Sequence, residues 1–187
     1  TSLVLSGGGG GHGGVEMSNY NETGILKLIL NRGGWLAVFL LSLSLTSVVM
    51  SGFEHTLSDQ IELSYFVPLL IGHGGNAGGQ TVGTVLSAMS SGQVGFEDWV
   101  RVVAKECVAG LGAGTLTCAA VLPLLALMKI SAHVSVVVLV TLPVLTVLAS
   151  GLAAGLPFLA ASLGLDPAVI AAPAMTTLVD IGGLVSY

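Results

Sequence analysis

The chain has 187 residues, of which 53% are hydrophobic and only 8% are charged, and its mean hydropathy is +0.94. Soluble domains carry about 25% charged residues, so this composition excludes an ordinary soluble fold and indicates an integral membrane protein surrounded by lipid. The net charge of -5 comes without a basic cluster, which excludes a nucleic-acid-binding surface. Cys107 and Cys118 lie too far apart along one apolar run to form a disulfide, so we expect free thiols.

The first 24 residues are glycine-rich and polar, unlike the rest of the chain. This composition is typical of a flexible tail or linker. The stretch lacks the basic start and long apolar core of a signal peptide, and nothing in it is typical of a catalytic site. We therefore predict a tail or linker over residues 1–24 and a membrane domain over residues 25–187.

Five apolar segments follow, and together they predict an all-α membrane protein with five transmembrane helices. A membrane-spanning helix needs about 20 predominantly apolar residues. The segments that meet this need cover residues 35–52, 63–89, 100–127, 134–163 and 167–187.

Basic residues predict the orientation of these segments. Lys27 and Arg32 precede the first segment, and Arg101 and Lys105 begin the third, whereas Lys129 lies on the opposite side. Lys and Arg favour the cytoplasmic side of a membrane. We therefore expect a cytoplasmic N-terminus in a plasma (inner) membrane.

Two glycine pairs have the spacing that lets helix backbones approach closely in lipid. They are Gly110–Gly114 in the third segment and Gly151–Gly155 in the fourth. We favour helix contacts within one bundle over a dedicated dimer motif for both pairs.

The second segment reads "FVPLLIGHGGNAGGQTVGTVLSAM" and places glycines and amides inside an apolar run. Its G-x-G-x-x-A pattern is not a dinucleotide site, because that site needs a soluble strand–turn–helix unit. A helix loosens at membrane depth only where its backbone is buried or faces water, so an interruption here predicts a pore with available carbonyls. Asn76 and Gln80 share one helix face; hydrogen bonding to neighbouring helices is the alternative role for them.

Asp180 is the strongest sign of function in the sequence. It lies 14 residues beyond the helix start that Asp166 and Pro167 predict, or about 20 Å into a core about 30 Å thick. A carboxylate at that depth usually faces a watery path or a partner, and no Lys or Arg lies deep enough to pair with it. A protonated carboxyl held by hydrogen bonds is the alternative.

The residues before Asp180 add further oxygen atoms. Pro173 frees one backbone carbonyl, and Thr176 and Thr177 carry hydroxyls. Hard oxygen ligands without a Cys or His cluster suit Mg²⁺ or Ca²⁺.

The other acidic residues are less specific. Glu54, at the outer end of the first segment, is either a solvated helix end or part of an outer mouth. Glu97 and Asp98 are typical of an acidic cap for the third helix, and Glu106 lies near the cytoplasmic boundary of that helix.

Three stretches resemble the membrane domain of MgtE-type magnesium transporters, which are related to a eukaryotic solute-carrier family. They are "SVVMSGFE", "PLLIGHGGNAGGQ" and "DPAVIAAPAMTTLVDIGGLVSY", and the resemblance covers residues 32–187. It implies five helices per subunit, a homodimer, and an ion path lined by helices two and five of each subunit.

The resemblance also implies roles for individual residues. Asp180 would hold Mg²⁺ at the centre, and backbone oxygens of Gly72 and Thr176 would line that site. Residues of the second helix would shape the adjoining wall, and one acidic residue would match the end of the first helix; these residues are Gly75, Asn76, Gly79 and Glu54.

The sequence departs from the family in three respects. Nothing in it matches the cytoplasmic superhelical domain and paired CBS modules of better-known members, so we expect a fragment or a naturally short member. Ala172 stands where some relatives place Asn, and His73 stands where small or apolar residues are expected.

These observations predict passive, channel-like Mg²⁺ transport, with the hydrated ion held at Asp180 and no other small-molecule substrate. An exchanger driven by Na⁺ or H⁺ is the alternative, and it would need further ionisable residues within the spans. An intramembrane enzyme would need a nucleophile or a metal-binding set, and neither is present in the sequence. A non-conducting subunit would leave Asp180 unexplained.

Overall fold

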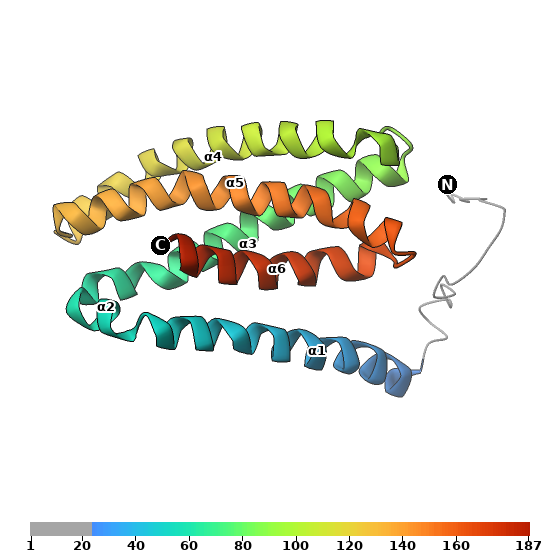
Figure 1. Ribbon diagram of the computed structural model, residues 1–187, viewed down its shortest axis with the longest axis horizontal. Coiled ribbons are helices and arrows are strands. Elements are labelled where there is room, and N and C mark those ends of the chain that lie inside the picture. The colour runs from blue at the N-terminus through green and yellow to red at the C-terminus, as the bar shows by residue number, and fades with distance from the viewer. Residues whose placement is uncertain (1–23) are drawn as a thin grey trace, which may run out of the picture.

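The computed structural model describes residues 24–187, apart from the side chains at positions 27, 28, 31, 32, 35 and 56. The predicted tail therefore lies outside the described residues, except for Gly24. Five long helices lie roughly side by side along the longest dimension of the molecule (Figure 1). The helices are α1 (Ile25–Gly52), α2 (Glu54–Asp59), α3 (Ile61–Ser90), α4 (Trp99–Leu127), α5 (Ala132–Ser162) and α6 (Pro167–Ser186), with a short 3₁₀ helix at Phe96–Asp98.

The all-helical prediction is confirmed, whereas the number of spans is supported only in part. Among the described residues, three helical stretches are long and apolar enough to cross a membrane: Phe96–Leu127, Ala132–Ser162 and Pro167–Ser186. The apolar part of α1, Leu36–Gly52, is shorter. Five spans stay a prediction.

Two predictions about the helices are wrong. Helix α3 runs without interruption through the glycine cluster, because its packed face holds the glycines in helical conformation despite their low helix propensity. Its carbonyls therefore take part in ordinary helical hydrogen bonds. Asp98 does not cap α4 with its side chain; its carboxylate accepts instead from the Gly95 N–H, at 3.0 Å, on the 3₁₀ turn before the helix.

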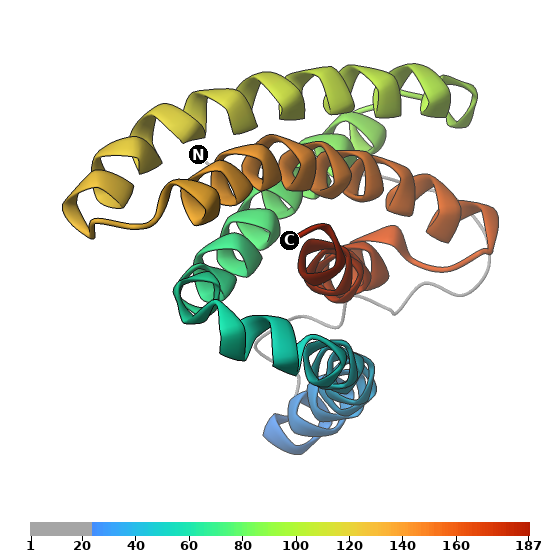
Figure 2. The same ribbon diagram turned by 60° about the vertical axis from the view of Figure 1, so that its left-hand side comes forward.

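Helix α5 forms the centre of the bundle and contacts α3, α4 and α6. Figure 2 shows it running between α4 and α6. Its most buried side chains are fully inaccessible to solvent; they are Val138, Leu142, Leu145, Ala149, Ala153 and Ala154. Helix α1 lies at the edge of the bundle and exposes many large apolar side chains, as expected for a helix against lipid.

The glycine pairs of α4 and α5 act within the bundle, as predicted. A Cβ on Gly110 would lie 2.8 Å from Ser150 Oγ, and one on Gly114 would lie 2.6 Å from Pro143 Cα. A Cβ on Gly151 would approach Cys107 Sγ to 2.9 Å. Both cysteines are free thiols, which confirms that expectation.

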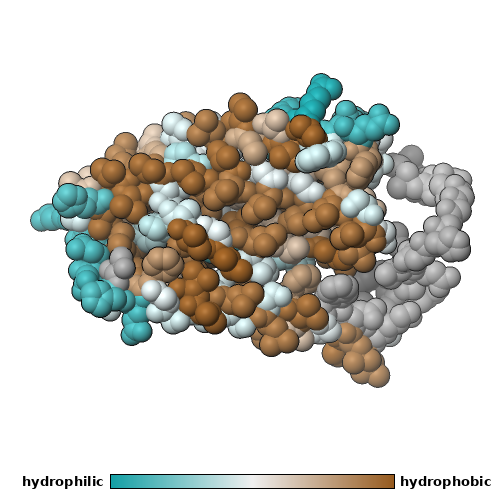
Figure 3. All heavy atoms as spheres, in the orientation of Figure 1, coloured by the Kyte–Doolittle hydropathy of each residue, from teal (hydrophilic) through white to brown (hydrophobic). Residues whose placement is uncertain are grey.

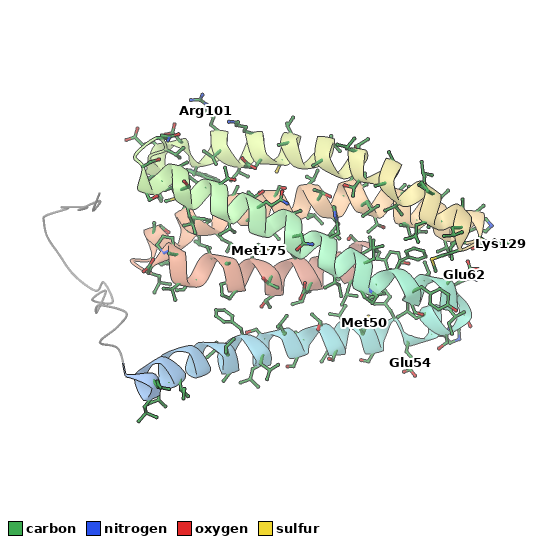
Figure 4. The ribbon with its side chains drawn as sticks, turned by 180° about the vertical axis from the view of Figure 1, so that it is seen from behind. Met50, Glu54, Glu62, Arg101, Lys129 and Met175 are labelled. Atoms are coloured by element: carbon green, nitrogen blue, oxygen red, sulfur yellow. The ribbon has the colours of Figure 1, made fainter. Side chains whose placement is uncertain are left out.

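The surface and the charges follow the same axis as the helices. On the face shown in Figure 3, hydrophobic atoms cover the middle of the molecule and hydrophilic atoms gather at its ends. Arg101 and Lys129 lie at opposite ends (Figure 4). This separation is consistent with the predicted sidedness of the basic residues, which stays a prediction.

Candidate functional site

The start of α6 fixes the depth of Asp180. The Asp166 carboxylate accepts from the Ala168 N–H at 2.9 Å, and Pro167 is the first helical residue, as predicted. The hydroxyls of Thr176 and Thr177 bond back to the helix, at 3.0 Å to Ala172 O and 3.2 Å to Pro173 O. Their hydrogens are therefore engaged, and only their oxygen atoms remain available to a ligand.

Asp180 itself is half-buried. Within residues 24–187, its carboxylate has neither a hydrogen-bond partner nor an ion-pair partner. A neutral carboxyl held by hydrogen bonds thus finds no support within the described subunit. A carboxylate near the middle of an apolar helix needs water, an ion or another polar group to stabilise it.

Two glycines of α3 allow α6 to pack closely against α3. A Cβ on Gly74 would lie 2.6 Å from Val179 Cγ1, and a Cβ on Gly78 would collide with the Met175 side chain. These two glycines were not singled out from the sequence. The available signal was their i,i+4 spacing, which is also the spacing of the Gly110–Gly114 pair.

Gly75 and Asp180 each follow directly after the contact pair Gly74 and Val179. The residues just before the contact pair face α5: His73 Nε2 bonds Thr146 Oγ1 at 2.8 Å, and Leu178 lines an apolar groove with residues of α5. Gly75 follows His73 by two residues, and Asp180 follows Leu178 by two residues. Two residues correspond to a rotation of about 200° around the helix axis. Gly75 is thus turned away from the contact of His73 with α5, and Gly75 and Asp180 are both only half-buried.

The backbone oxygens of Gly72 and Thr176 approach the same depth as the Asp180 side chain. Helical carbonyls point toward the C-terminus of their helix, whereas side chains tilt toward its N-terminus. In the antiparallel register set by Gly74 and Val179, the two carbonyls and the carboxylate are thus directed to nearly one level. What relates these three groups is therefore their common depth along the helices.

One face of α3 carries an exposed stripe of small and polar residues. A Cβ added to Gly72, Gly75 or Gly79 would meet no atom of the described subunit within 4 Å. The stripe continues into an open groove of about 690 Å³ lined mainly by α3. The exposed members of the stripe are Gly72, Asn76, Gly79, Gln80, Gly83, Thr84 and Ser87.

The remaining candidate acids lie elsewhere. Glu54 is the first residue of α2 and lines an open groove with the end of α1 and the start of α3, and Asp180 is not among the residues of this groove (Figure 4 shows the position of Glu54). Glu106 faces the opposite side of α3, where Thr81 Oγ1 donates to its carboxylate at 3.4 Å. Among the described residues, no group of three or more His, Cys, Asp and Glu side chains could hold a metal ion.

Sequence reasoning missed the role of Glu62. Its carboxylate accepts from the Ser131 backbone N–H at 3.0 Å and so ties the start of α3 to the start of α5. The Ser131 side chain and then its N–H lower the pKa of Glu62, because both stabilise the charged form.

Comparisons with known proteins indicate the family of the chain. Residues 67–187 match the family model described as "MgtE: Divalent cation transporter". The chain is 37% identical over 172 residues to the magnesium transporter MgtE of Thermus thermophilus, covering 90% of this chain and 37% of that protein. It is 25% identical over 177 residues to the magnesium transporter MgtE of Enterococcus faecalis, covering 95% and 39%.

A third relative, the magnesium transporter MgtE of Bacillus subtilis, is 25% identical over 154 residues, covering 82% of this chain and 34% of that protein. The chain thus spans little more than a third of the length of these relatives. The extent of the family match and the Thermus relative together show that the chain belongs to the MgtE family of divalent cation transporters.

Proposed function

We propose that the chain forms a channel-like path for passive Mg²⁺ transport, in which Asp180 holds the hydrated ion. The observation that carries this proposal is the Asp180 carboxylate, which lies well along an apolar helix, is half-buried and has no partner among the described residues. Magnesium transport by the relatives supports the choice of ion.

The path requires two copies of the chain. A dication needs more than one negative charge, and one subunit offers one deep carboxylate on this face. A two-fold axis beside α3 and α6 would bring two Asp180 side chains to one path and would cover the polar stripe of α3. We therefore propose a homodimer with five spans per subunit, its N-terminus in the cytoplasm.

The hydrated form of the ion follows from its chemistry. Mg²⁺ gives up water reluctantly and prefers six oxygens at about 2.0–2.1 Å. In a dimer, the two Asp180 carboxylates and the four carbonyls of Gly72 and Thr176 would amount to six oxygens, but these carbonyls lie within continuous helices and cannot all close to that distance around one ion. They would instead accept hydrogen bonds from the bound waters, while Gly75, Asn76 and Gly79 shape the adjoining wall. An inside-negative potential acts on the dication with about 4.6 kcal/mol per 100 mV.

Flux measurements on reconstituted vesicles test this function. A passive path predicts Mg²⁺ flux that follows the membrane potential and the Mg²⁺ gradient and is unchanged by imposed Na⁺ or pH gradients. Flux that requires either gradient would favour the ion-coupled exchanger. Cobalt hexammine, an inert mimic of hexahydrated Mg²⁺, should compete; flux unaffected by it would contradict binding of the hydrated ion.

A further inference from the structure

A second polar site lies on the opposite side of α3 from Gly75. It is a pocket of about 190 Å³ between α3, α4 and α5. Its polar lining comprises Gln80, Thr81, Thr84, Glu106, Thr146 and Ser150, of which Gln80 and Thr84 stand at the border with the open groove and line both. Glu106 is seven residues past the start of α4, or about 10 Å along the helix, which places the pocket inside the apolar part of the bundle.

Two groups in this pocket lack full hydrogen-bonding partners. Ser150 is only 4% exposed, yet its hydroxyl has no hydrogen-bond partner in the described chain. The half-buried Glu106 carboxylate accepts one long bond, from Thr81 Oγ1 at 3.4 Å. Among the described residues, no side-chain oxygen is both fully buried and without a partner, so these two groups are open to the pocket and can meet water or a ligand there.

Other hydroxyls of the pocket are already engaged. Thr146 Oγ1 donates to Leu142 O at 2.6 Å, so it accepts from His73 Nε2–H at 2.8 Å. Thr84 Oγ1 donates to Gln80 O at 2.9 Å. The groups free to meet a ligand are therefore the Glu106 carboxylate and the oxygens of Thr81 and Ser150.

We propose that this pocket binds a small monovalent cation of the Na⁺ type through Glu106, Thr81 and Ser150. Carboxylate and hydroxyl oxygens are hard ligands, which suit such a cation and not a soft metal. One carboxylate balances one positive charge, whereas a divalent ion would leave an uncompensated charge in a region of low dielectric. The volume accommodates the cation with several waters, each of which takes about 30 Å³.

Gly110 keeps the pocket open. A Cβ at this position would lie 2.8 Å from Ser150 Oγ and 2.9 Å from Thr146 O. The glycine thus serves both the α4–α5 contact and the access of a ligand to the Ser150 hydroxyl.

The test is thermal unfolding of the purified chain in lipid nanodiscs as NaCl replaces choline chloride at constant ionic strength. The wild type should gain a saturable rise in melting temperature, and Glu106→Gln should lose it. Ser150→Ala should weaken the apparent Na⁺ affinity about tenfold, the equivalent of one lost polar contact. Asp180→Asn and the matched surface variant Glu97→Gln should keep the full rise.

Several results would overturn the proposal. These are no saturable Na⁺ effect in the wild type, an undiminished effect in Glu106→Gln, displacement of Na⁺ by lower concentrations of Mg²⁺, or a high-resolution map with water only in the pocket. If Glu106→Gln does not fold, binding of ²²Na⁺ to the wild type decides: competition by Li⁺ but not choline supports the site, and no binding refutes it. Because the readout is Na⁺ binding, its failure would leave the Asp180 proposal intact.

Discussion

The two faces of α3 use the same residue type for different purposes. Gly74 and Gly78 lie directly against α6. An added side chain at either position would therefore collide with Val179 or Met175. A Cβ added to Gly75 or Gly79, one residue further along, would meet no atom beyond the neighbouring backbone within 4 Å. Glycine on the first face permits helix packing, and glycine on the second leaves open space, which we propose belongs to the ion path. The direction in which a glycine faces, and not the glycine content of the helix, therefore separates packed from open positions.

Enlarging the packed face should have the largest effect on folding. Gly78→Leu would force α3 and α6 apart, and we expect it to lower the free energy of unfolding by about 3 kcal/mol or more. Loss of the monodisperse peak in size-exclusion chromatography, with a fall in melting temperature, would check this. A variant as stable as the wild type would refute the described contact.

Enlarging the open face should affect transport and not folding. Gly75→Leu, the open-face counterpart of Gly78→Leu on the same helix, should change stability by no more than about 1 kcal/mol, since helix propensity even improves. Its Mg²⁺ flux should fall about tenfold or more, because the side chain enters the proposed path. Normal flux in a folded Gly75→Leu variant would show that this face lies elsewhere.

The sequence predicts much of this fold because its signals are local. Apolar runs located the long helices, Asp166 and Pro167 marked the start of α6, and GxxxG spacing marked the α4–α5 contact. The continuity of α3 could not be predicted, since tertiary packing overrides the low helix propensity of glycine. Nor could the distinction between Gly74 and Gly75, which depends on where α5 and α6 lie.

Long-range polar contacts also could not be predicted from the sequence. Glu62 meets Ser131 across 69 positions, and His73 meets Thr146 across 73. The Asp180 assignment was accessible because its chemistry is unusual at that depth whatever surrounds it. The polar pocket around Glu106 forms where three helices meet, so no single segment of the sequence could predict it.

Inhibition by cobalt hexammine should be sensitive to the open face only. Asn76→Ala should weaken competition by this ion several-fold by removing a polar group from the proposed wall, whereas Thr81→Ala, on the opposite face, should leave competition unchanged. Concentration–inhibition curves of Mg²⁺ flux would measure both. Equal effects from the two variants would break the distinction between the faces.

The smallest expected effect concerns Glu62, whose carboxylate, unlike that of Asp180, has a hydrogen-bond partner. Because the pKa of Glu62 is lower in the folded state, its bond to Ser131 adds stability above the ordinary pKa of about 4.5, and this stability is lost as the pH falls through the folded-state pKa. Glu62→Gln should therefore melt slightly below the wild type at pH 6, and the two should converge as the pH falls below the lowered folded-state pKa of Glu62. A constant difference in melting temperature across this range would contradict the assignment.

The central claim is that Asp180 supplies the charge that the transported ion meets. The most direct test is Mg²⁺ flux into vesicles at a fixed potential, comparing the wild type with Asp180→Asn, which keeps size and hydrogen bonding but removes the charge. We predict that flux falls about 100-fold, the equivalent of about 2.7 kcal/mol, while the melting temperature is maintained. Near-normal flux in a correctly folded Asp180→Asn protein would contradict the proposed path.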